Sequence, residues 1–164
     1  MGMHQELMDV RKVIRNDSDL WKLLYYQAEN SIHDVLEEPD VLNFDRAILN
    51  EIIKKRLKFT PVTDDLVEDK ICRIIFYAGT RTTQGGNYAI ADQLLNIDIF
   101  VHRDFNDVDM RLAKICDRVD FLFNKKRVAG FGKAQFVNGK PFNLSDEGYT
   151  GYTLVYKLGS NNGM

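Results

Sequence analysis

The sequence has few of the features that mark exported, membrane-spanning or strongly nucleic-acid-binding proteins. Only two cysteines occur in 164 residues, and both lie inside apolar stretches, so we expect buried, reduced thiols and assembly in a cytoplasm. No apolar run approaches the roughly 18 residues of a membrane span, and the N-terminus lacks the apolar core of a signal peptide. The formal net charge of −2 gives no reason to expect a nucleic-acid or membrane partner.

The sequence also has no recognisable motif for metal binding, cofactor binding or nucleophilic catalysis. The three histidines and two cysteines show no metal-ligand spacing. The glycines at 85–86 and 130–132 do not supply the spacing of a phosphate-binding loop, and no serine or cysteine lies in a nucleophile elbow. We therefore expect no catalytic residue, no metal and no cofactor, and a protein that is not an enzyme.

Two weaker patterns each match part of a known catalytic motif. His102-Arg103-Asp104 looks like the catalytic loop of a protein kinase. A kinase would also need a glycine-rich loop and an asparagine five positions after the aspartate, where this chain has Asp109. We interpret the triplet as polar residues at the end of a strand.

The second pattern is an acidic cluster before a strand. Glu68, Asp69 and Lys70, combined with Asp40 or Asp64, could form the two carboxylates and lysine of a metal-dependent nuclease. The cluster suits the N-terminus of a helix equally well, because the helix dipole favours negative charge there. A small metal-dependent nuclease therefore stays as an alternative from a different functional class.

Basic residues gather in two places, at 54–58 and at 125–127. Both groups lie at the C-terminal ends of predicted helices, where positive charge complements the helix dipole. This local explanation is favoured over a role in phosphate contacts.

The strongest local prediction covers residues 91–126, a strand followed by a long helix. Apolar residues first alternate with polar ones, at Leu95, Ile97, Ile99 and Val101. From Asn106 the spacing changes to the three and four of an amphipathic helix, with Val108, Leu112, Ile115, Val119 and Leu122 on one face. The rest of the chain is expected to pack on this unit.

The remaining patterns predict three helices before this unit and further strands around it. The helices are expected at residues 7–14, 18–24 and 44–57, with an irregular acidic surface connection at 29–43. Thr63 to Lys70 can form one helical turn, and the other strands are expected at 71–78, 133–137 and 149–158. Asn138-Gly139 is a hairpin signal between the last two, although Pro141 and the polar stretch NLSDEG suggest a wider excursion.

This order predicts an α+β fold. It comprises a mostly antiparallel four-stranded sheet (β-β-α-β-β) packed on one long helix, with an N-terminal helical extension. We expect a single domain overall, in which residues 1–60 form a helical segment packed on the same core as an α/β unit at 61–164.

The best functional lead from pattern alone is the polar stretch at residues 79–93. It has no usable period, so it predicts an unusually long hairpin loop of about fifteen residues between two strands. Loops of that length in compact domains are usually functional or disordered. An open sheet also has edges that must be covered, and assembly into a ring or filament is one way to cover them.

Several stretches together resemble the small neck and tail proteins of long-tailed bacteriophages. They are KFTPVTDDL, ICRIIFYAGTR, ADQLLNIDIFVH, DVDMRLAKICDRVDFLFN and EGYTGYTLVYKLGS. The last two resemble most closely the tail-terminator, or tail-completion, proteins. The resemblance covers about the C-terminal two-thirds of the chain, and the N-terminal helices look like an addition to it.

The resemblance implies a structural virion protein of the phage neck, assembled in the host cytoplasm as a hexameric ring. The ring would cap the tail tube, dock on the head connector or stopper protein and let DNA pass through its lumen as cargo, with no membrane involved. The loop would reach the ring surface or lumen, which makes Arg81, Gln84, Asn87 and Tyr88 candidates for contacts with the tube or neighbouring subunits. A head-completion or connector ring is the alternative in the same class.

Overall fold

A five-stranded mixed sheet organises the fold. The computed structural model describes residues 2–84, 87–129, 132–144 and 147–158, without the side chains of residues 83–91. The strands stand in the order β1-β2-β3-β5-β4. Their bounds are Leu57–Lys58 for β1, Cys72–Gln84 for β2, Asn87–His102 for β3, Gln135–Leu144 for β4 and Tyr149–Leu158 for β5.

The predicted sheet of four mostly antiparallel strands on one long helix is wrong. β1 adds a fifth strand and pairs in parallel with β2, Leu57 opposite Ile74 and Lys58 opposite Ile75. Two residues directly after a helix carry no alternation, so the sequence gives no strand signal there. The other neighbouring pairs in the sheet are antiparallel.

Helices of two kinds occur in the described part of the chain. The α-helices are α1 (Met3–Arg15), α2 (Ser18–Tyr25), α3 (Arg46–Arg56), α4 (Arg103–Asp109) and α5 (Arg111–Phe123). Short 3-10 helices occur at η1 (Val35–Glu37), η2 (Val41–Asn43) and η3 (Asp64–Val67). The segment at 29–43 is thus more ordered than expected, because Val35 and Val41 are fully buried.

The single long helix predicted after β3 is divided at Met110. This residue has a left-handed backbone conformation, with φ of 55°, between α4 and α5. Asp109 and Arg111 on either side are buried and form an ion pair of 2.9 Å. Arg111 also donates hydrogen bonds to the carbonyl oxygens of Leu23 and Tyr26. The division therefore places the charged pair Asp109 and Arg111 in the protein interior. Hydrophobic spacing alone cannot predict a buried ion pair.

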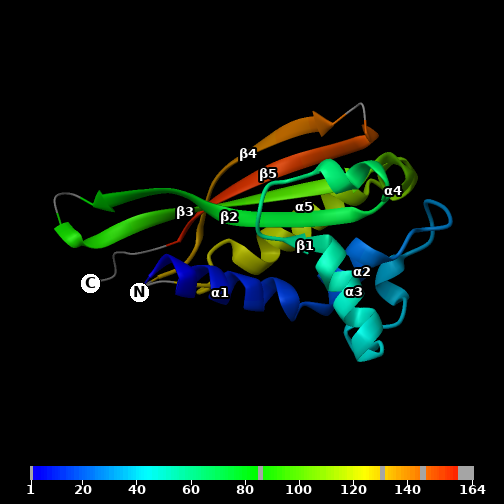
Figure 1. Cartoon of the computed structure of the whole chain (residues 1–164), viewed down its shortest axis with the longest axis horizontal. Helices are drawn as coiled ribbons and strands as arrows, with labels where there is room; N and C mark the ends of the chain where they lie inside the picture. Colours follow the sequence, from blue (N-terminus) through cyan, green and yellow to red (C-terminus); the bar gives the residue numbers. More distant parts are fainter. Residues whose placement is uncertain (1, 85–86, 130–131, 145–146, 159–164) are drawn as a thin grey trace.

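The main core lies between the sheet and the helices on one of its faces. Figure 1 shows α1, α2, α3 and α5 gathered on the same side of the twisted sheet. Their fully buried side chains include Trp21, Ile14 and Val119, packed with Ile97 and Tyr156 of the sheet. A smaller cluster, including Leu66 of η3 and Phe100 of β3, covers part of the other face.

The two cysteines are free, as expected. Cys72 is buried and Cys116 half-buried. Burial raises the pKa of each thiol to about 12, so both stay protonated at neutral pH.

Residues 79–93 do not form the predicted loop. β2 and β3 continue through this stretch as a paired hairpin, with Arg81 opposite Gln93 and Thr82 opposite Asp92, and a register shift between Ala78 and Arg81. The hairpin extends well beyond the helices (Figure 1). Because the outer part of this hairpin projects beyond the helices, it needs no hydrophobic alternation, which explains why the stretch reads as a loop. Gly85 and Gly86 lie outside the described residues.

The tight turn signalled by Asn138-Gly139 is wrong, because both residues lie inside β4. β4 and β5 do pair as an antiparallel hairpin, and their connection follows Leu144, in the polar stretch expected to form a wider excursion. Within the described residues, no helix has the length and apolar character needed to span a bilayer.

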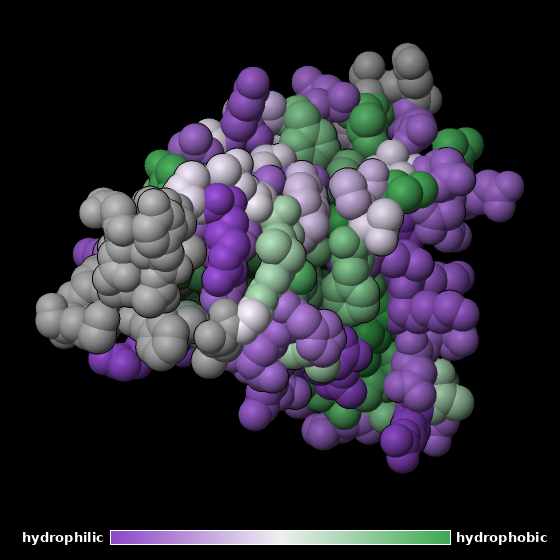
Figure 2. All heavy atoms as spheres, turned by 60° about the vertical axis from the view of Figure 1, so that its left-hand side comes forward, coloured by the Kyte–Doolittle hydropathy of each residue, from purple (hydrophilic) through white to green (hydrophobic). Residues whose placement is uncertain are grey.

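Figure 2 shows one side of the molecule, where hydrophobic atoms lie in a recess between hydrophilic ridges. Part of the apolar surface of this chain is therefore not covered by the chain itself.

Candidate functional site

The loop residues proposed from the sequence are placed on the projecting hairpin. Arg81 is in β2, where its guanidinium lies 3.4 Å from the Glu6 carboxylate of α1 and 3.2 Å from the side-chain oxygen of Gln93. Arg81 therefore connects the hairpin to α1. Gln84, Asn87 and Tyr88 belong to the strand ends, and their side chains lie outside the described residues.

The His102-Arg103-Asp104 triplet lies at a strand end, as interpreted from the sequence. His102 ends β3 and caps α4, with its Nδ1 accepting a hydrogen bond from the Asp104 backbone N–H at 3.1 Å. Burial lowers the pKa of His102 below its usual value. Asp104 forms an exposed ion pair with Lys70 at 3.4 Å. These contacts are local capping and pairing.

The residues of the nuclease alternative are engaged separately. Lys70 pairs with Asp104, and the Asp40 carboxylate accepts hydrogen bonds from Ser18 and the Leu42 backbone. In the described residues, no group of three or more His, Cys, Asp and Glu side chains is arranged to hold a metal ion.

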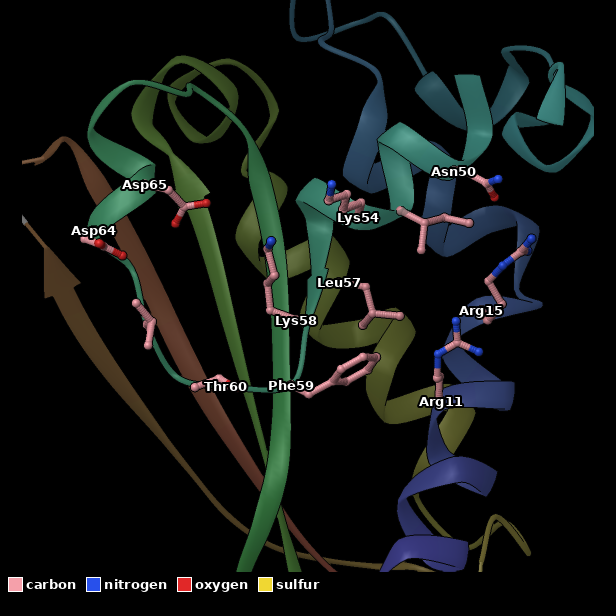
Figure 3. A pocket seen from close by; sticks show the side chains of 12 residues that line it. Arg11, Arg15, Asn50, Lys54, Leu57, Lys58, Phe59, Thr60, Asp64 and Asp65 are labelled. Atoms are coloured by element: carbon pink, nitrogen blue, oxygen red, sulfur yellow. The ribbon is translucent and has the colours of Figure 1, made fainter. Parts of the chain in front are cut away.

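A cleft of about 710 Å³ lies between α1, α3, β1 and the segment that follows β1 (Figure 3). We call it the basic cleft. Its apolar lining includes Ile53, Leu57 and Phe59. The basic residues that line it are Arg11, Arg15, Lys54 and Lys58.

The four basic residues of the basic cleft have no ion-pair partner in the part of the chain that the structure describes. Arg11 instead stacks over the Phe59 ring, with its guanidinium carbon 6.0 Å from the ring centroid. Cations that surround an apolar floor and lack carboxylate partners favour a ligand that is both anionic and apolar.

Two acidic residues, Asp64 and Asp65, line one wall of the basic cleft, so its lining carries four basic and two acidic side chains. The Asp65 carboxylate is held by the fully buried Arg73, at 2.7 and 2.8 Å, and Arg73 also donates to the Lys55 carbonyl oxygen. The Arg73 hydrogen bonds lower the pKa of Asp65, and the charge of Lys58 helps to lower it. This network ties the wall to β2 and to the end of α3, so the cleft is largely pre-formed.

A smaller apolar groove of about 340 Å³ adjoins the basic cleft. The two share Arg11 and Phe59. The groove runs between α1 and β2, where Leu7 and Met8 face Phe76. The Phe59 and Phe76 rings meet edge to face with 5.2 Å between centroids, yet Phe59 stays 53% exposed.

The two outer edges of the sheet differ in their protection. β1 covers β2 only at Ile74 and Ile75, so residues 76–84 of β2 have no second strand partner in the described sheet. The other edge, β4, carries Lys140 and Pro141, whereas residues 76–84 of β2 include neither lysine nor proline. Register shifts occur on both edges, after Phe136 in β4 and between Ala78 and Arg81 in β2. Lysine, proline and bulges are the devices that blunt an edge against pairing.

Sequence reasoning missed the basic cleft because it explained residues 54–58 by the helix dipole alone. Lys54 and Lys58 do lie around the end of α3, but Arg11 and Arg15 of a distant helix face them across the cleft. The available signal was the four-residue spacing of Arg11 and Arg15, which places both on one helix face.

A comparison with known families decides where the chain belongs. The model of the YomW family matches residues 17–158, most of the chain. The chain belongs to the YomW family. It is 30% identical to the SPbeta prophage-derived protein YomW of Bacillus subtilis (strain 168), over 96% of each chain. Membership of the YomW family indicates a phage-derived protein. The family match spans α2 to β5, so Arg11 and Arg15 of α1 lie before it.

Proposed function

We propose that this YomW-family protein is a structural virion protein, a tail terminator that forms a ring at the head–tail interface of a phage. The observation that carries the proposal is the unprotected edge of β2 on a hairpin that projects from the body. The phage origin of the family and the resemblance to tail-terminator proteins support the same function.

The difference between the two sheet edges supports assembly through β2. A projecting strand with free backbone groups pairs readily with other chains, so proteins normally blunt such edges. In this chain β4 carries a lysine and a proline, whereas residues 76–84 of β2 carry register shifts alone and have no second strand partner in the described sheet. An edge left open beside exposed apolar residues such as Phe59 and Val62 is best explained as an assembly surface.

In the proposed mechanism the ring acts by steric and interfacial contacts, without catalytic turnover. One face of the ring caps the finished tail tube and the other docks on the head connector, while DNA passes through the lumen as cargo. The hairpin, including Arg81, provides contacts to neighbouring subunits or to the tube. The protein would therefore reside in the phage neck after assembly in the host cytoplasm.

The direct test is electron microscopy of particles made by the encoding phage without this protein. We expect tails of irregular, excessive length and heads that carry no tail, because nothing stops tube growth or joins the parts. Tails of regular length beside unjoined heads would favour a head-completion ring instead. Normal, joined particles would contradict the proposal.

A variant carrying Thr80→Lys and Thr82→Lys tests the β2 edge in the purified protein. Both threonines are exposed, so folding should be retained, while added charge at the edge should shift the oligomer toward monomer in size-exclusion chromatography with light scattering. Asn138→Lys on the blunted β4 edge is the matched control and should assemble like the wild type. Equal assembly of both variants would remove β2 from the interface.

A further inference from the structure

We propose that the basic cleft of one subunit receives the acidic loop of a second copy of this chain. The acidic loop comprises residues 29–38 between α2 and the end of η1. This inference rests on the proposed ring and names one contact that would hold its subunits together.

The acidic loop presents carboxylates that complement the excess of basic side chains in the basic cleft. Glu29, Asp34 and Glu37 are exposed, and no ion-pair partner for the Glu29 or Glu37 carboxylate occurs within the described residues. Ile32 lies between them with 90% of its surface exposed. The loop therefore presents an apolar residue flanked by unpaired carboxylates.

The loop is ordered enough to be presented as a unit. Asp34 caps η1 by accepting a hydrogen bond from the Leu36 backbone N–H at 3.0 Å. His33 pairs with Glu38 at 2.7 Å, and its other ring nitrogen accepts from the Glu29 backbone N–H. Behind the loop, Val35 is fully buried in the main core. These contacts leave Ile32, Glu29 and Glu37 pointing outward as the free groups.

The basic cleft offers the complementary arrangement. Its four cations without ion-pair partners in the described chain surround an apolar floor of Ile53, Leu57 and Phe59. Ile32 fits this floor by hydrophobic contact, and Glu29 and Glu37 fit the surrounding arginines and lysines. Complementary charge of this kind fixes the register of an interface and speeds encounter.

The geometry requires two copies. Figure 1 shows the chain between α2 and η1 at the end of the molecule opposite the projecting hairpin, whereas the basic cleft faces the side formed by α1 and β1. A contact between two different surfaces is heterologous, so it repeats from subunit to subunit and closes into a ring when the rotation permits. The acidic loop and the basic cleft are thus the two halves of one repeating interface.

The test uses two charge-reversed forms of the full chain. The cleft variant carries Arg15→Glu and Lys54→Glu, and the loop variant carries Glu29→Lys and Glu37→Lys. Each alone should lose the oligomer in light scattering, because like charges then meet at every contact. Mixing them should restore assembly, since each loop meets a cleft of opposite charge in the other variant. Lys133→Glu with Lys140→Glu is the matched control and should assemble as the wild type does.

Each of the other outcomes overturns the contact between the acidic loop and the basic cleft. The outcomes differ in whether they also overturn the proposed ring. Variants that assemble normally, or that the mixture does not rescue, remove this contact but leave the ring in place. A cleft variant that keeps its ring but no longer binds tail tubes would assign the cleft to the tube protein. Wild-type protein that stays monomeric at high concentration would overturn the proposed ring itself. Circular dichroism and thermal melting check that each variant folds, and rescue by mixing provides the same check independently.

Discussion

At the scale of single residues, two fully buried arginines hold elements together that are far apart in the chain. Arg73 joins β2 to η3 and to the end of α3 through Asp65 and the Lys55 carbonyl. Arg111 joins α5 to α4 through Asp109, and to the end of α2 through the Leu23 and Tyr26 carbonyls. Neither contact could be predicted from the sequence, because arginine at these positions looks like surface charge in a one-dimensional pattern.

We expect Arg111→Met to lower the free energy of unfolding by about 3–5 kcal/mol, since it leaves the buried Asp109 carboxylate with only the half-exposed Lys114, at 3.5 Å. Urea denaturation measures this change. Arg127→Met, at an exposed position, is the control and should change stability by less than about 0.5 kcal/mol. A loss below about 1 kcal/mol at position 111 would show that the ion pair is not structural.

His102 makes stability depend on pH. Burial lowers its pKa in the folded protein, so the unfolded chain binds the proton more readily. The contribution is fully present above the unfolded pKa of about 6.5 and is lost as pH falls below it. Protonation of Nδ1 would also break the cap on the Asp104 N–H.

The corresponding variant is His102→Asn, which keeps a capping oxygen but does not titrate. The unfolding free energy of the wild type should fall between pH 7 and pH 5.5, and that of the variant should fall less steeply. Urea denaturation across this range is the measurement. Identical slopes would show that His102 does not cause the pH dependence.

At the scale of elements, the predictions held where hydrophobic periodicity was strong. The last strand, Tyr149–Leu158, and the first helix follow their patterns closely. Prediction failed for three features that hydrophobic periodicity does not determine. β1 is formed by pairing with β2, and the division between α4 and α5 is stabilised by a buried ion pair. The outer hairpin is formed by strand pairing beyond the helices.

Gly151 of β5 leaves no space for a side chain, because the Phe142 ring of the neighbouring strand β4 packs directly over it. A Cβ atom at this position would lie 2.2 Å from the Phe142 ring and 2.7 Å from the Ile99 carbonyl oxygen. The Phe142 ring can rotate away, but the backbone of β3 cannot. Gly151→Ala should therefore destabilise the protein by about 1–3 kcal/mol, seen as a lower thermal midpoint. An unchanged midpoint would contradict this packing.

At the scale of the whole molecule, the structure is a mixed sheet with α1, α2, α3 and α5 on one face and η3 on the other. It has two kinds of surface that the chain itself does not cover. One is the open edge of β2, and the other is the pair formed by the basic cleft and the acidic loop. The sequence indicated a phage protein through resemblance, and family membership supports that origin. It did not indicate the cleft, because its residues come from α1, α3 and β1 and converge only in three dimensions.

The central claim is that this 19.0 kDa chain assembles into a ring. Electron microscopy of the purified wild-type protein, together with its mass in solution, tests it most directly. We expect closed rings of six subunits with an open lumen, which persist as the sample is diluted within the micromolar range. A protein that remains monomeric at high concentration and shows no ring would contradict it.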